Sequence, residues 1–157
     1  MFFAVVTTQL QAQKFGYVRS AEILENFPEV KQAEANLEAL QKQLQKRGEG
    51  MVEKLRTDYQ TIQQKMERGE LSPIQQEDEA KKLKAREGEI AKFEQDMVKQ
   101  IQDKRTALLK PIYEKINKAI ADVAKEGGYQ FIFDQGVLLY FDEGMDVSKQ
   151  VKAKLGM

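Results

Sequence analysis

The stretch RGELSPIQQ, residues 68–76, interrupts a long run of helical sequence and decides the fold. Gly69 suits the position just after a helix, where the backbone takes a left-handed conformation. Ser72 and Pro73 suit the N-cap and the first position of a new helix, and Gln75 stands where a capping box needs it. One helix therefore ends and another begins within a few residues, which predicts a helical hairpin.

The segments on either side of this turn have the periodicity of two paired helices. Before the turn, apolar residues recur at steps of three and four, with a stutter at two successive steps of four. The expected seam there consists of Val30, Ala33, Leu37, Leu40, Leu44, Met51, Leu55, Tyr59, Ile62 and Met66. After the turn, apolar residues recur from Leu83 to Val123. Such a narrow seam buries one stripe against one partner helix, so the prediction is an antiparallel coiled coil.

Prolines set the expected limits of this arm at residues 28–111. With the turn near residues 70 and 71, Pro28 falls nearly opposite Pro111. About 40 residues per helix, at 1.5 Å each, would give an arm of roughly 60 Å.

Three glycines interrupt the arm partway along its length. Gly48 and Gly50 fall within roughly a turn of the height of Gly88 on the other helix. Each glycine inside a helix lowers helix stability by about 1 kcal/mol. We therefore expect these three positions to form a hinge.

Two pieces of sequence outside the arm predict a small β-rich body, residues 13–27 and 112–157. KFGYV at residues 14–18 suggests a strand, and GGYQFIFDQGVLLYF at residues 127–141 suggests a β-hairpin with a turn at Asp134-Gln135-Gly136. The body is marginal for an independent core, so oligomerisation is expected. The candidates for the oligomer interface or body core are Tyr17, Val18, Phe131, Phe133, Leu139 and Phe141.

Composition limits the classes of function. The chain has 25 basic and 25 acidic residues, and this zero net charge argues against nucleic acid as a partner. It has no His and no Cys, which removes the commonest general base, thiol nucleophiles and structural zinc. The acidic run at residues 142–146 fits a turn better than a calcium loop. The sequence therefore predicts no enzyme, cofactor or metal site.

The N-terminus, MFFAVVTTQLQAQ, is apolar and then polar, with no charge before Lys14. We interpret residues 1–12 as the remnant of a secretory signal peptide. The apolar run is too short to cross a membrane, and no stable membrane insertion is expected.

The two ends of the chain resemble one known family. FGYVRSAEILENFPEVKQAEANLE at residues 15–38 resembles the mature start of Skp/OmpH-type periplasmic chaperones. GGYQFIFDQGVLLYFDEGMDVSKQVKAKLG at residues 127–156 resembles their C-terminal part. The resemblance implies a homotrimer, in which a small body carries three helical arms around a cavity. It also implies an ATP-independent periplasmic holdase that binds unfolded outer-membrane proteins.

The charge pattern departs from that family, whose well-known members are strongly basic. Residues 30–68 hold 8 basic and 6 acidic residues, and residues 81–126 hold 12 and 8, so the two helical stretches together are net positive by six. The tip, residues 69–80, has four acidic residues and no basic one, and no lipopolysaccharide site is predicted. The alternative function is a structural coiled-coil scaffold or spacer of the cell envelope. A prefoldin-like chaperone is disfavoured, because prefoldin strands lie between the arm helices.

Overall fold

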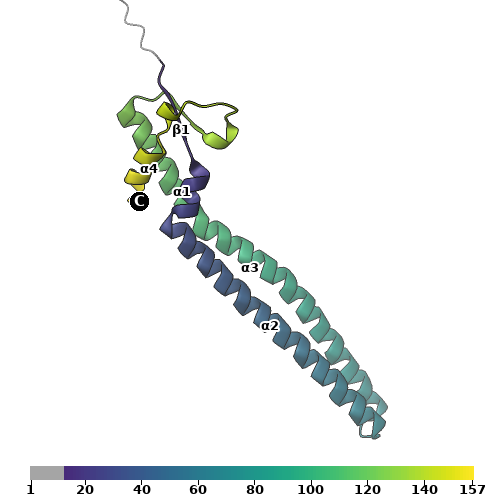
Figure 1. Ribbon diagram of the computed structural model, residues 1–157. Coiled ribbons are helices and arrows are strands. Elements are labelled where there is room, and N and C mark those ends of the chain that lie inside the picture. Colours follow the sequence, from purple (N-terminus) through teal and green to yellow (C-terminus); the bar gives the residue numbers. More distant parts are fainter. Residues whose placement is uncertain (1–12) are drawn as a thin grey trace, which may run out of the picture. The chain divides into compact units, whose positions relative to one another are not determined.

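The computed structural model describes residues 13–157, and the interpretation of residues 1–12 lies outside the described part (Figure 1). The chain divides into two compact units. The arm is the unit of residues 32–109, and the body combines the described chain up to Lys31 with residues 110–157. Two long helices, α2 (Pro28–Glu67) and α3 (Pro73–Gly127), contribute to both units.

The turn between α2 and α3 has the local structure that its sequence predicts. Gly69 has a φ of 68°, and its N–H donates to the carbonyl of Met66 at 3.0 Å. The N–H of Glu70 donates to the carbonyl of Lys65 at 2.9 Å, which completes a Schellman motif. Ser72 and Gln75 form the expected capping box, with N–H to side-chain oxygen distances of 2.9 and 3.4 Å. Both helix ends are therefore satisfied within the turn.

The seam of the arm follows the predicted positions closely, except near the tip, where the predicted seam residues Tyr59 and Met66 are both exposed. Leu37 and Leu44 of α2 and Leu83 and Phe93 of α3 are buried. Tyr59, predicted in the seam, is exposed, and the partly buried position next to it belongs to Asp58. The residues of α2 that face α3 are Ala33, Leu37, Leu40, Leu44, Gly48, Met51, Leu55, Asp58 and Ile62. Their two successive steps of four run from Leu40 through Leu44 to Gly48, so the stutter lies nearer the N-terminus of α2 than predicted.

The sheet of the body differs from the predicted β-hairpin. β1 (Phe15–Val18) and β2 (Phe131–Asp134) pair in parallel, with Phe15 opposite Phe131 and Val18 opposite Asp134. Residues 137–141 form no strand, so the hairpin prediction is wrong. After β2, the side chain of Asp134 accepts the N–H of Gly136 at 2.7 Å, and the chain enters the short 3-10 helix η1 (Gln135–Val137).

The core of the body is formed by helix faces that close on β1. α1 (Ser20–Asn26) contributes Ile23, and α4 (Ser148–Leu155) contributes Val151 and Leu155. A second 3-10 helix, η2 (Glu143–Met145), precedes α4, and the N–H of Val147 donates to the carbonyl of Tyr17 at 2.9 Å. The buried apolar residues of the body are Tyr17, Val18, Ile23, Phe27, Val30, Ile112, Ile116, Ala119, Val123, Val147, Val151 and Leu155.

Candidate functional site

The most prominent apolar surface of the body lies on one face of its sheet. Phe15 and Phe131 are register partners, and their stacked rings have centroids 5.9 Å apart. Phe131 also stacks on Phe133, at 6.1 Å. All three side chains are exposed. A contiguous cluster of exposed aromatic rings marks an interaction surface more often than it marks free surface.

The loop after η1 adds further exposed apolar side chains. Leu139 and Tyr140 have relative exposures of 106% and 86%, and Val137 and Met145 are also exposed. Phe141 differs from them, because its ring packs on Tyr17 with 4.8 Å between centroids. The loop is therefore attached to the sheet through Phe141 while its tip residues have no apolar neighbours to cover them.

The six body residues singled out in the sequence occupy two different environments. Tyr17 and Val18 are buried in the core of the single chain, and Phe141 is partly buried. Phe131, Phe133 and Leu139 are exposed. The second group is available for contacts with another molecule, and the first group holds β1 in place.

A polar cluster fixes the end of β1 against the start of α4. The backbone N–H of Arg19 donates to Oγ of Ser148 at 2.8 Å, and Nε of Arg19 lies 3.1 Å from Oδ2 of Asp146. The other carboxylate oxygen of Asp146 accepts the N–H of Ser148 at 2.8 Å. The hydroxyl of Tyr17, followed by the Asp146 carboxylate, raises the pKa of the Arg19 guanidinium. Arg19 therefore stays charged and can pair with the carboxylate of Asp146.

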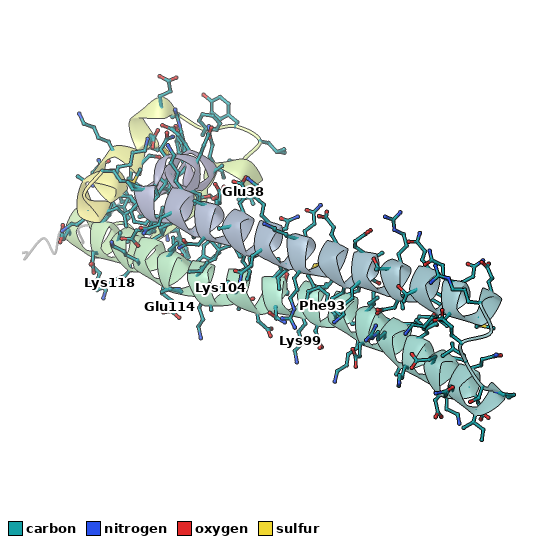
Figure 2. The ribbon with its side chains drawn as sticks, turned by 90° about the horizontal axis from the view of Figure 1, so that it is seen from below. Glu38, Phe93, Lys99, Lys104, Glu114 and Lys118 are labelled. Carbon is teal, nitrogen blue, oxygen red and sulfur yellow. The ribbon has the colours of Figure 1, made fainter. Side chains whose placement is uncertain are left out.

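In the arm, an aromatic residue occupies the place left by a glycine. Figure 2 shows Phe93 on α3, where its side chain is directed toward α2. A Cβ atom added at Gly48 would lie 3.3 Å from Cε1 of Phe93. The guanidinium of Arg47 lies over the same ring, 5.0 Å from its centroid, and Phe93 is buried. The absence of a side chain at Gly48 therefore gives Phe93 room in the seam.

Nearer the tip, an ion pair replaces apolar packing in the seam. Asp58 of α2 and Arg86 of α3 form a salt bridge between the helices, and both side chains are only partly exposed. The hollow that they line also contains Lys65 and Lys82. Glu79 lines the same hollow and pairs with Lys82 at 2.7 Å, so Asp58 and Glu79 together offset the three cations.

The described residues offer no arrangement suited to metal binding or membrane crossing. Within residues 13–157, no group of three or more His, Cys, Asp or Glu side chains could hold a metal ion. In the same range, no helix is long and apolar enough to span a bilayer. The described residues do present exposed aromatic and aliphatic side chains, both on the body and on the long helical arm.

A protein-family model described as "Outer membrane protein (OmpH-like)" matches residues 14–155. The chain belongs to the OmpH-like family. The match spans both units and includes the two end segments that carried the resemblance in the sequence. This membership places the chain among chaperones and not among enzymes.

A relative and a solved structure agree with this membership. The chaperone protein Skp of Yersinia enterocolitica is 29% identical over 160 residues, which cover 93% of this chain and 90% of the relative. The crystal structure of an OmpH-like protein from Caulobacter crescentus CB15 is 17% identical and superposes with a TM-score of 0.80. That superposition covers 99% of this chain and 90% of the other, and it shows that the OmpH-like fold is shared.

Proposed function

We propose that this OmpH-like protein is a periplasmic holdase, which binds unfolded outer-membrane proteins and prevents their aggregation without ATP. The observation that carries the proposal is the similarity to the Skp chaperone, because it extends over nearly the whole of both chains. The signal-like character of the first twelve residues supports export to the periplasm.

The proposed working form is a homotrimer assembled through the body. The stacked rings of Phe15, Phe131 and Phe133 supply an apolar surface, and the tip of the loop after η1 supplies Leu139 and Tyr140. Contacts with two further copies would bury these side chains. Burial of apolar surface stabilises an assembly by roughly 25 cal/mol for each Å². Phe131, Phe133 and Leu139 are therefore the interface residues of this proposal.

The proposed mechanism is enclosure of the client between the arms of the trimer. An unfolded barrel protein exposes apolar side chains along its whole length, so it can contact three arms at once. Each contact is weak, but contacts within one enclosure raise the effective concentration of the next. A client held in this way can leave when a stronger sink, such as membrane insertion, becomes available, and no nucleotide is required.

An aggregation assay tests the proposal. A urea-denatured outer-membrane barrel protein is diluted into buffer, and light scattering is followed with and without this protein and without nucleotide. We expect suppression of scattering at about three chains per client. Leu139→Ser with Tyr140→Ser should weaken the trimer and reduce protection, because these side chains would lose their apolar contacts. Ile74→Ser, at an exposed apolar residue of the arm, is the control that should leave the trimer intact.

The outcomes separate the proposal from its main alternative. An intact trimer that leaves scattering unchanged would overturn the holdase function and favour a structural spacer of the cell envelope. Protection by a monomer, or an unchanged trimer in the double Ser variant, would overturn the proposed assembly through the body.

A further inference from the structure

Apart from Ile74 beside the turn, four large apolar side chains of the arm lie outside its seam and are exposed. Three of them, Val52, Tyr59 and Met66, follow one another at intervals of seven residues on α2. The fourth, Val98, belongs to α3. Seven residues are close to two helical turns, so the three side chains of α2 form a stripe along one side of that helix. The stripe covers 14 residues, or about 21 Å.

All four side chains lie on the same face of the hairpin. Val52 follows the seam residue Met51 by one position, and Tyr59 follows Asp58 in the same way. In two antiparallel helices, residues that follow their seam neighbours by one position point to the same side of the pair. Val98 follows Met97 of the seam and therefore shares this side.

A hydrogen bond across the helices supports this geometry. The hydroxyl of Tyr59 donates to Oε1 of Glu87 at 2.6 Å, and Glu87 follows the seam residue Arg86 by one position. The bond holds the ring of Tyr59 over the groove between α2 and α3. The same hydrogen bond raises the pKa of the Tyr59 hydroxyl, which at neutral pH is protonated even without this shift. We call the side that carries Val52, Tyr59, Met66 and Val98 the apolar face.

By the same rule the apolar face also carries Arg56, Gln63, Lys84, Glu87 and Glu94 between its large apolar side chains. The opposite face differs in having no large apolar side chain in the half of the arm next to the turn. It contains the residues that precede each seam residue by one position, and in the half of the arm next to the turn these are small, polar or charged. They are Gly50, Lys54, Thr57 and Thr61 on α2, and Lys82, Ala85, Glu89, Lys92 and Asp96 on α3. Both faces belong to the same two helices. A difference in helix stability therefore does not explain why only one face carries large apolar side chains.

The size of the apolar face decides what kind of partner fits it. Four side chains that are about half exposed offer roughly 400 Å², about half of the ~800 Å² that each folded partner contributes to a stable interface. They also stand about 10 Å apart along α2, because seven residues separate them. A second folded copy would bury too little apolar surface on these separated side chains to form a stable interface. A flexible chain can instead place one apolar side chain against each of these side chains.

We propose that the apolar face is the surface of the arm that contacts the client, and that its ligand is an extended, unfolded segment rich in apolar and aromatic side chains. The inference rests on the proposed holdase function and assigns it to named residues. Tyr59 offers an aromatic ring with a fixed orientation, and Met66 offers a flexible thioether that adapts to different side chains. Segments of outer-membrane strands have the required composition, because every second residue faces lipid in the folded barrel.

The experiment compares two triple variants of α2 with equal numbers of glutamines. The first, Val52→Gln, Tyr59→Gln and Met66→Gln, removes the stripe. The matched control, Lys54→Gln, Thr57→Gln and Thr61→Gln, changes the opposite face. Binding of an unfolded barrel protein is followed by the client's tryptophan fluorescence, since this chain has no tryptophan of its own. We expect the first variant to raise the Kd about tenfold, and the control to change it by less than about twofold.

Further controls keep the result interpretable. Circular dichroism and light scattering must show unchanged helicity and oligomeric state in both triple variants. Ile74→Gln tests general apolarity, since Ile74 is more exposed than any residue of the stripe, at 74%, and lies near the turn. Tyr59→Phe keeps the ring and should retain most of the affinity. If the first triple variant loses helicity, a photoactivatable cross-linker at position 59 or at position 57 of the otherwise unchanged chain replaces it.

The outcomes distinguish this inference from the function on which it rests. Failure of the unchanged protein to bind the client overturns the holdase function itself. Normal binding by the unchanged protein with equal losses in the two triple variants, or with equal cross-linking at positions 57 and 59, overturns only the assignment of the apolar face. An Ile74→Gln loss as large as that of the stripe variant would likewise show that no particular face is used.

Discussion

A methyl group added at Gly48 would meet the ring of Phe93, whereas nothing lies within 4 Å of a methyl group added at Gly50 or Gly88. The three glycines of the predicted hinge therefore differ in what they do. Gly48 makes room for a buried aromatic ring in the seam. Gly50 and Gly88 have no such contact, so their effect on the arm is that of the flexible backbone alone.

This difference predicts unequal stabilities for three alanine variants. Gly50→Ala and Gly88→Ala should each raise the free energy of unfolding by up to about 1 kcal/mol, because both positions are helical and open. Gly48→Ala should raise the free energy of unfolding by less, since the ring of Phe93 must move by a few tenths of an ångström. Urea denaturation of the three variants provides the comparison. In a Phe93→Leu background, Gly48→Ala should raise the free energy of unfolding by as much as the other two substitutions. An equal increase for all three alanine variants in the original background would contradict the packing role of Gly48.

The hinge itself remains a prediction, and flexibility is measured separately from stability. Spin labels on Gln64 report distances between arm tips in the assembled protein. We expect Gly50→Ala with Gly88→Ala to narrow that distance distribution, because alanine restricts the backbone of both helices. An unchanged distribution, with stability raised as predicted, would show that the arm bends elsewhere or remains straight.

At the scale of single elements, the salt bridge between Asp58 and Arg86 makes the seam less apolar near the tip. Partly buried ion pairs often contribute little net stability, because desolvation offsets the attraction. Such a pair still disfavours a shift of α2 along α3, since the charges would then face apolar residues. We infer that this pair fixes the register of the hairpin more than it stabilises the hairpin.

Replacing the pair with leucines tests that view. Asp58→Leu with Arg86→Leu should raise the free energy of unfolding by about 1–2 kcal/mol, because a well-packed apolar seam needs no desolvation of charge. Asp58→Leu alone should raise the free energy of unfolding less or lower it, since it leaves the partly buried Arg86 without its partner and beside Lys65. Thermal unfolding followed by circular dichroism measures both. A double variant less stable than the original protein would show that the ion pair is a major stabilising contact.

The same scale shows which elements a sequence can predict. The hairpin turn was predictable, because Gly69, Ser72 and Gln75 act within a few residues of one another. The sheet was not, because the partner of β2 is more than 100 residues away in the chain. Asp134 and Gly136 indicated a β-turn, and they do form a local turn, but it leads into η1. The hydroxyl of Ser20 also donates to Asp134, a contact that no local pattern reveals.

The candidate surfaces could also be predicted from the sequence only in part. Aromatic alternation in the two strand segments identified Phe131 and Phe133, but exposure could be assigned only once β1 was paired with β2. The stripe on α2 was not predicted, because the predicted seam placed Tyr59 and Met66 among the buried residues. Asp58 takes the seam position instead, and this change of one residue turns Tyr59 outward.

At the scale of the whole molecule, the proposed division of labour follows from where apolar surface is exposed. The body exposes stacked aromatic rings that suit contact with further copies of the chain. The arm exposes separate apolar spots that suit a flexible client. Charged side chains, 25 basic and 25 acidic in the chain, keep the remaining surface hydrated. Assembly and client binding can therefore be altered independently.

Native mass spectrometry of the protein mixed with an unfolded outer-membrane barrel protein tests the central proposal most directly. We expect free protein at the mass of three chains, and a complex at the mass of three chains plus one client. The complex should form without nucleotide, and the Leu139→Ser and Tyr140→Ser variant should yield less of both species. A monomer or dimer as the main free species, or a trimer that binds no client, would contradict the proposed trimeric holdase.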